Sequence, residues 1–254
     1  MPSPSGVEAV RRILRWYFHV SYGRWEGPGV LPFYCDPGRV GSFAVEPGDL
    51  AAGTEAALFK LLVGFSLYQA RRDVYIMDLQ REMRPTTVLR MTDRRLLGKL
   101  ISEHPCDQLR DAMALARGCS VMRDATGHGV CGYRPRTPCH VKTTSAAIRR
   151  MGDMGKLPSS AWLHVRARDG FSGMLARATA THSNPRERAL HLVDAFAMIH
   201  RVGRKLATLF VSALSTPELA PGLTPWADRV DGSSLVVVDT NVARIVDSLR
   251  GSAA

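Results

Sequence analysis

Apolar residues recur at helical spacing along most of this chain, and this periodicity constrains the fold more than any other feature. From Thr54 onward the pattern is interrupted mainly by short segments rich in glycine and proline. The one run typical of a strand, LVVV at residues 235–238, is too short and isolated to build a sheet. The sequence therefore predicts an all-α fold.

Glycine and proline positions divide this pattern into expected helices and loops. Residues 22–53 and 119–140 are rich in both residue types, so we expect irregular structure there. The clearest helix start is NPRE at residues 184–187, where asparagine caps, proline occupies the first turn and glutamate lies at the third helical position. We expect helices over residues 7–19, 54–65, 73–83, 92–102, 107–117, 144–154, 160–168, 170–180, 185–199 and 240–250.

The chain carries a large positive charge. It has 34 lysines and arginines against 23 aspartates and glutamates, a formal net charge of +11. Such an excess favours a polyanionic partner, most often nucleic acid, through counterion release at phosphates. A GC-rich genome, which enriches arginine in every protein, explains the same composition, so the charge alone leaves both interpretations open.

The apolar segments suit neither a membrane span nor export. The longest of them, residues 58–67, contains Lys60 and is too short to cross a bilayer. No apolar segment of the kind found in secretory signals follows Arg11 and Arg12. We therefore expect a cytoplasmic protein without membrane association, whose five cysteines are reduced thiols or metal ligands.

Two segments carry the candidate chemistry. Residues 199–211, IHRVGRKLATLFV, join the end of one helix to the next through a short glycine-containing turn. Backbone N–H groups at such a turn and at the following helix N-terminus can hold a DNA phosphate without reading its sequence. Residues 236–246, VVVDTNVARIV, place Asp239 at an expected helix N-terminus, where the dipole favours the ionised carboxylate. Taken alone, Asp239 is better interpreted as a simple N-cap.

Together these segments resemble the DNA glycosylases of the helix-hairpin-helix superfamily, which include endonuclease III and the adenine-mismatch glycosylase. The family hairpin, L-P-G-V-G-R-K-T-A, is matched by IHRVGRKLA at residues 199–207. The family aspartate motif, V-D-T-H-V-x-R, is matched by VDTNVAR at residues 238–244. FKLLVGFSLYQARRD at residues 59–73 resembles the family helix F-x-L-L-x-A-x-x-L-S-x-Q-x-x-D. The three motifs occur in the family's order.

The chain departs from the family pattern in four respects. Arg201 occupies the position of the first hairpin glycine, so we expect a less tight turn and an altered phosphate contact. Residues 215–234 lengthen the connection between the hairpin and the aspartate motif, and residues 106–157 have no family counterpart. No cysteine follows Cys139, so the iron–sulfur cluster of endonuclease III is not expected here.

The resemblance implies an enzyme that flips a base out of duplex DNA and cleaves its N-glycosidic bond. Asp239 would stabilise the positive charge that develops on the deoxyribose. Lys205 matches the lysine of bifunctional members, which attacks the sugar carbon, forms a Schiff base and leads to strand cleavage by β-elimination, an AP-lyase activity. The alternative for Lys205 is a simple phosphate contact.

Further DNA contacts are expected around these two residues. Gln69 matches the family residue that fills the space of the flipped base, although a solvated glutamine at a helix end explains it equally well. Tyr68 and Arg71 beside it are candidate wedge or phosphate contacts. The other expected DNA contacts are Arg201, Val202, Gly203, Arg204, Asn241 and Arg244. Three tryptophans are candidates for stacking on the flipped base but are more simply core residues: Trp16, Trp25 and Trp162.

A structural zinc ion is a further candidate, and no other cofactor is expected. Thiolates and imidazoles suit zinc, which would hold together a loop with few apolar residues. The spacings include no C-x-x-C pair and match no standard framework, so free thiols are favoured. The candidate ligands are Cys119, Cys131, Cys139 and His140, with His128 nearby.

The resemblance also implies two helical lobes with a DNA-binding cleft between them. Residues 1–53 and 204–254 would form the lobe that carries Lys205 and Asp239, and residues 54–203 a helical-barrel lobe ending in the hairpin.

We expect a monomer that binds double-stranded DNA, and a non-enzymatic helix-hairpin-helix DNA-binding protein is the alternative. The sequence does not choose among several substrate bases: oxidised pyrimidines, oxidised guanine, mismatched or methylated bases, and hypermodified phage bases. The last would imply a role in defence, and the others a role in repair.

Overall fold

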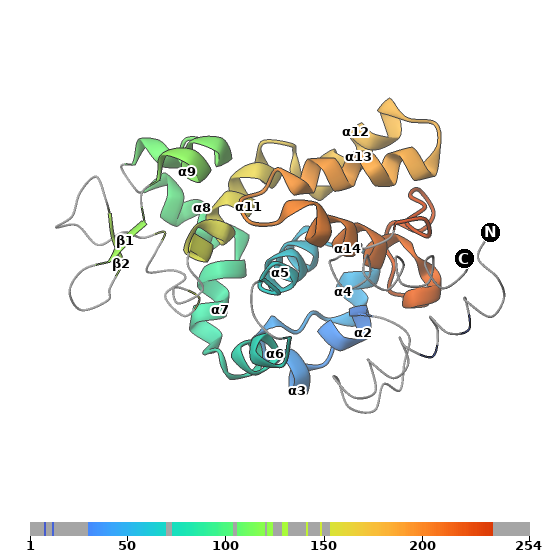
Figure 1. The fold of residues 1–254 in the computed structure, drawn as a ribbon, viewed down its shortest axis with the longest axis horizontal. Helices are drawn as coiled ribbons and strands as arrows, with labels where there is room; N and C mark the ends of the chain where they lie inside the picture. Colours follow the sequence, from blue (N-terminus) through green and yellow to red (C-terminus); the bar gives the residue numbers. More distant parts are fainter. Residues whose placement is uncertain are drawn as a thin grey trace, which may run out of the picture.

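The computed structural model describes Glu8, Arg12 and residues 30–69, 73–103, 106–119, 121–123, 129–131, 141, 148 and 153–235. This part of the chain is mostly helical, which confirms the all-α fold (Figure 1). The α-helices are α2 (Val30–Tyr34), α3 (Pro37–Val40), α4 (Pro47–Ala51), α5 (Glu55–Ser66), α6 (Asp73–Glu82), α7 (Pro85–Thr92), α8 (Arg94–Ser102), α9 (Ala112–Gly118), α11 (Leu157–Arg166), α12 (Gly170–Thr181), α13 (Pro185–Ala197) and α14 (Gly203–Ser215). The 3₁₀ helices are η1 (Gly41–Phe43), η2 (Asp107–Leu109), η4 (Asp153–Lys156) and η5 (Pro217–Leu219).

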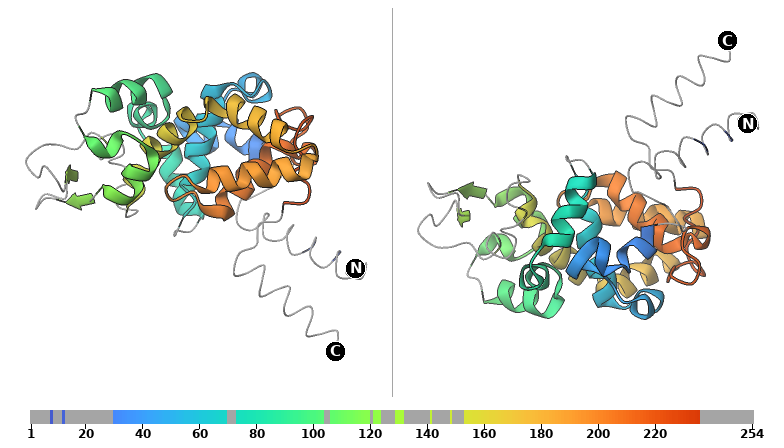
Figure 2. Two further views of the ribbon diagram at one scale, coloured as in Figure 1. Left: turned by 90° about the horizontal axis from the view of Figure 1, so that it is seen from above. Right: turned by 90° about the horizontal axis from the view of Figure 1, so that it is seen from below.

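A small antiparallel ribbon accompanies the helices. Its strands are β1 (Val121–Arg123) and β2 (Gly129–Cys131), with Val121 opposite Cys131. The ribbon lies at one end of the molecule in every view (Figure 2). From the sequence we expected only loop here, and this prediction was wrong over these six residues, because three-residue strands are too short to show a period.

Helix α5 forms the centre of the core (Figure 1). Nine of its twelve residues are buried, and it packs against α7, α11, α12 and α14. A helix that is apolar on all sides requires neighbours on all sides, which explains this central position. Gly64 permits a further close contact, with α2, since a Cβ there would lie 2.7 Å from Cε1 of Tyr34.

An aromatic cluster joins α12, α13 and α14 to the segment that follows them. Phe196 and Phe210 pack edge to face at 5.1 Å, and Trp226 stacks on Phe196 at 6.2 Å. Trp226 is 3% exposed, and its backbone N–H donates to the carbonyl of Leu214 at 3.0 Å. Residues 215–234, which the sequence led us to expect as an inserted connection, therefore fold back onto the core.

One buried polar side chain is satisfied inside this core. Gln80 donates from Nε2 to the carbonyl of Gly64 at 2.9 Å and to the Tyr34 hydroxyl at 3.3 Å. The Tyr68 hydroxyl donates to its Oε1 at 3.5 Å. A buried amide without partners would cost several kcal/mol, so this network fixes the position of α6 against α5 and α2.

The strongest helix-start signals of the sequence are confirmed. Asn184 accepts a hydrogen bond from the N–H of Arg186 at 2.9 Å, and Thr54 accepts from the N–H of Ala57 at 3.3 Å. The predicted helix 107–117 was wrong as a single element, because Asp111 interrupts it. The Asp111 carboxylate accepts from the N–H of Ala114 and starts α9 there, after the separate turn η2.

Other expectations need correction or fall outside the described residues. From residue 30 on, the segment expected to be irregular contains α2, α3, η1 and α4, and a separate helix, α7, precedes α8. Among the described residues, no helix is long and apolar enough to cross a membrane.

Several expected elements lie largely or wholly outside the described residues: the helices 144–154 and 240–250 and the run 236–238. Of the expected helix 7–19, only Glu8 and Arg12 are described. The two lobes and the cleft between them stay a prediction.

Candidate functional site

The predicted hairpin is formed by α13, a five-residue turn and α14. The two helices lie side by side (Figures 1 and 2), and residues 198–202 connect them. Ile199 and Val202 are each 2% exposed and fix the turn to the core, and the N–H of Val202 donates to the carbonyl of Ile199 at 3.0 Å. The N–H of His200 donates to Ser160 Oγ at 3.1 Å, which joins the turn to α11. The turn is therefore held on both sides.

Two residues of this turn have left-handed backbone. The φ angle is +66° at Arg201 and +55° at Gly203. These are the two positions at which the family hairpin has glycine, the residue that takes such angles without strain. Arg201 adopts the same left-handed conformation that a glycine would take, at a cost in backbone strain, whereas the sequence led us to expect a looser turn.

The first turn of α14 is exposed and basic. Gly203, Arg204 and Lys205 all lie at the surface, and a Cβ at Gly203 would meet no atom within 4 Å. Val202 at the N-cap has no side-chain acceptor to offer the first N–H groups. Cations at the positive end of the helix dipole cost roughly 0.3–1 kcal/mol each, a cost that a bound anion would offset. This end of α14 is therefore suited to a phosphate.

The aspartate motif lies outside the described residues. Asp239, Asn241 and Arg244 belong to it, and Arg71 is likewise outside. The structure thus places the lysine and hairpin half of the candidate site, and the position of the carboxylate relative to Lys205 stays a prediction.

Gln69 lies at the end of α5, where its side chain caps the helix. Nε2 donates to the carbonyl of Ser66 at 2.6 Å, and the backbone N–H donates to the carbonyl of Leu67 at 2.8 Å. The side chain is half-buried in this arrangement. Insertion into a duplex would require Gln69 to give up the contact with Ser66. Tyr68 is also half-buried, and burial raises the pKa of its hydroxyl.

Trp162 has a structural role in α11. Its indole is 8% exposed, Nε1 donates to the carbonyl of Arg94 at 2.9 Å, and the Arg166 guanidinium lies 4.8 Å over the ring. Trp16 and Trp25 lie outside the described residues.

The zinc prediction stays open in the same way. Cys119 is half-buried, the backbone of Cys131 belongs to β2, and Cys139 and His140 lie outside the described residues, as does His128. Within the part of the chain that the structure describes, no three cysteine, histidine or acidic residues come together as metal ligands.

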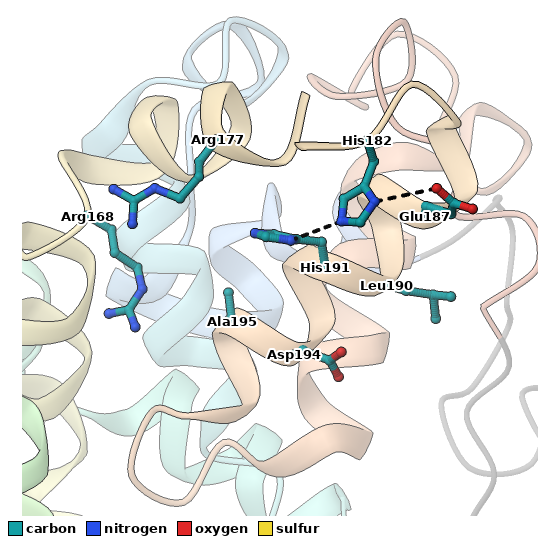
Figure 3. A pocket seen from close by; sticks show the side chains of 8 residues that line it. All are labelled: Arg168, Arg177, His182, Glu187, Leu190, His191, Asp194 and Ala195. Atoms are coloured by element: carbon teal, nitrogen blue, oxygen red, sulfur yellow. Dashed lines mark hydrogen bonds and ion pairs between the residues drawn. The ribbon is translucent and has the colours of Figure 1, made fainter. Parts of the chain in front are cut away.

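A cavity that the sequence analysis did not anticipate lies on the outer side of α12 and α13 (Figure 3). Its volume is about 520 Å³. The rings of His182 and His191 approach to 3.3 Å between Nε2 and Nδ1, and His182 Nδ1 lies 3.4 Å from Glu187 Oε2. The lining residues are Arg168, Arg177, His182, Glu187, Leu190, His191, Asp194 and Ala195.

One wall of this cavity is fixed by a buried histidine. His164 is 3% exposed, and burial, with the charge of Arg168, lowers its pKa from 6.5 to about 4. The ring is therefore neutral at pH 7. Arg168 Nη1 lies 3.2 Å from His164 Nδ1 and donates to the His164 carbonyl at 3.2 Å. Because a guanidinium only donates, Nδ1 is the acceptor.

The cavity and the hairpin meet at one ion pair. Asp194 lines the cavity, and its Oδ1 lies 2.5 Å from Arg204 Nη1 in the first turn of α14. The cavity therefore lies next to the first turn of α14.

Comparison of this chain with protein-family models, with curated proteins and with solved structures found no match.

Proposed function

We propose that this chain is a monomeric DNA glycosylase with AP-lyase activity, acting on double-stranded DNA. One observation carries the proposal: α13 and α14 are joined by a turn with left-handed backbone at Arg201 and Gly203, followed at once by Lys205 in an exposed first helical turn. This is the arrangement that the helix-hairpin-helix motif requires for a phosphate contact beside a nucleophilic lysine.

The roles of the residues follow from their chemistry. N–H groups at the start of α14 bind a phosphate and set the strand in register, while Arg204 adds a charge-assisted contact. Lys205 attacks the sugar carbon of the flipped nucleotide, and the base departs as the new C–N bond forms. Asp239 contributes a carboxylate that stabilises the positive charge on the sugar.

The strain at Arg201 supports a functional interpretation of the turn. A non-glycine residue in left-handed backbone costs of order 1 kcal/mol or more, and such residues cluster at functional sites. Arginine at this position adds a positive charge beside the phosphate site, which a glycine would not.

The same exposed basic turn also favours a second candidate, a DNA-binding protein without catalysis. Arg201 and Arg204 would bind phosphates equally well in such a protein. The two candidates differ at Lys205, because only the enzyme forms a covalent bond through its amine.

The test is a panel of duplexes that each contain one altered base, incubated with the full chain and with borohydride. The enzyme yields abasic sites, nicks and a trapped protein–DNA adduct on at least one duplex. Lys205→Gln abolishes the adduct, whereas Lys99→Gln, which alters an exposed lysine of α8, leaves it intact.

Base release by the wild type without any trapped adduct would make the enzyme monofunctional and Lys205 a phosphate contact. Specific binding to duplex DNA without release of any base would favour the DNA-binding protein.

A further inference from the structure

Two arginines and two carboxylates line the cavity on α12 and α13. Its two acidic residues already have partners: Glu187 contacts His182, and Asp194 pairs with Arg204. Among the described residues, neither Arg168 nor Arg177 forms an ion pair with a carboxylate, although both line the cavity. The arginine side of the cavity therefore carries positive charge without compensation from these carboxylates.

Both arginines line this cavity and come from different elements (Figure 3). Arg177 lies on α12 and is exposed, whereas Arg168 follows α11 and is half-buried. Burial and the charge of Arg177 both lower the pKa of Arg168, as expected for two cations that share one region. Like charges at close range are unfavourable in the empty protein, and an anion between them removes that cost.

Arg168 is also held in position before any ligand arrives. Its Nη1 contacts both Nδ1 and the carbonyl of His164, whose neutral ring accepts the hydrogen bond. A guanidinium fixed in this way loses less side-chain entropy on binding, and its planar fork of N–H donors matches the oxygens of a phosphate.

From these contacts we propose that the cavity is a phosphate-binding site in which Arg168 and Arg177 hold the anion and His191 lies alongside. The volume of about 520 Å³ accommodates a phosphate with part of the molecule that carries it. The phosphate belongs either to a small phosphorylated molecule or to a DNA strand that continues from the hairpin past Asp194. The DNA source rests on the proposed function, and the small-molecule source does not.

The first arm of the test uses inorganic phosphate and deoxyadenosine monophosphate, titrated into the full chain and followed by calorimetry. Saturable binding is expected, weakened about tenfold or more in Arg168→Gln and in Arg177→Gln. Arg95→Gln is the matched control, because Arg95 is an exposed arginine of α8 outside the cavity. Since Arg177 is exposed, its variant keeps the test valid even if the half-buried Arg168 proves necessary for folding.

The second arm measures duplex affinity against salt concentration for the same variants. If the phosphate belongs to DNA, each cavity variant lowers the slope of log affinity against log salt by about 1 relative to Arg95→Gln. If the cavity binds phosphate in the first arm but the variants leave the salt slope of duplex binding unchanged, the phosphate belongs to a small phosphorylated molecule.

Cavity variants that match Arg95→Gln in both arms overturn the proposal. That failure is distinguishable from failure of the proposed function, because loss of base excision or of adduct formation at Lys205 is measured separately.

Discussion

Arg204 and Asp194 form an ion pair across the hairpin, with 2.5 Å between Nη1 and Oδ1. One residue lies in the first turn of α14 and the other near the end of α13. Both side chains are more than 60% exposed, so the pair contributes little to stability. The pair matters for the proposed DNA binding, because a phosphate bound at this end of α14 would compete with the Asp194 carboxylate for the same guanidinium.

Asp194→Asn is therefore expected to tighten duplex binding by about twofold to tenfold at low salt, since it removes a repulsive charge and releases Arg204. Fluorescence anisotropy with an undamaged duplex measures the change. Asp78→Asn is the control, because it breaks a similar exposed pair with Arg81 on α6. An Asp194→Asn affinity no higher than that of Asp78→Asn would show that Arg204 does not contact DNA.

Replacing Arg201 by glycine should separate stability from binding. Its φ of +66° suits glycine, so Arg201→Gly is expected to raise the free energy of unfolding by about 1 kcal/mol while weakening duplex binding. Gly203→Ala should act oppositely on stability: a Cβ there has open space, but φ of +55° strains alanine by about 1 kcal/mol. Urea unfolding measures both changes. Destabilisation by Arg201→Gly would mean that the arginine side chain, not the backbone, determines the turn.

Protonation of His164 should make stability depend on pH. Burial lowers its folded-state pKa to about 4, whereas an unfolded histidine has a pKa near 6.5. Between these values the unfolded chain binds a proton that the folded chain does not. The free energy of unfolding therefore falls as the pH decreases from about 6.5 to 4, by up to about 3 kcal/mol, and is unaffected by this group above that range.

Urea unfolding of wild type and His164→Asn from pH 4 to 7 tests this. The asparagine keeps an acceptor near Arg168 and removes the titration, so the variant is expected to have the flatter profile. Parallel profiles would assign the pH dependence to other groups.

The close approach of α2 to α5 depends on Gly64. Gly64→Ala places a Cβ 2.7 Å from the Tyr34 ring in a packed core and is expected to cost about 1–3 kcal/mol of stability. Gly48→Ala in α4 has no atom within 4 Å of its Cβ and should be neutral or slightly stabilising. Equal thermal unfolding midpoints for the two variants would contradict this packing.

The sequence predicted what depends on neighbouring residues. Asn184 followed by Pro185 specified the start of α13, because capping is a contact between residues two or three positions apart. The hairpin turn was predicted from Gly203 between two apolar helices for the same reason. Asp111 was missed as a cap since a helical pattern continues through it on both sides, and only the backbone shows the interruption.

The cavity could not be predicted, because its residues come together only in the folded chain. Arg168 follows α11, Arg177 belongs to α12, and His191 belongs to α13, with no motif spacing between them. The return of Trp226 to the core was missed for the same reason, since residues 215–234 show no helical period and were interpreted as a loop.

The central claim is the proposal that the carboxylate of Asp239 acts with Lys205. The most direct measurement is the single-turnover rate of base excision by Asp239→Asn, on a duplex that the wild type processes. The substitution keeps the shape of the side chain and removes the negative charge that, in the proposed mechanism, stabilises the sugar cation. Excision is expected to fall by about a hundredfold or more while duplex affinity holds or rises. Excision by Asp239→Asn at the wild-type rate would contradict the assignment of the site.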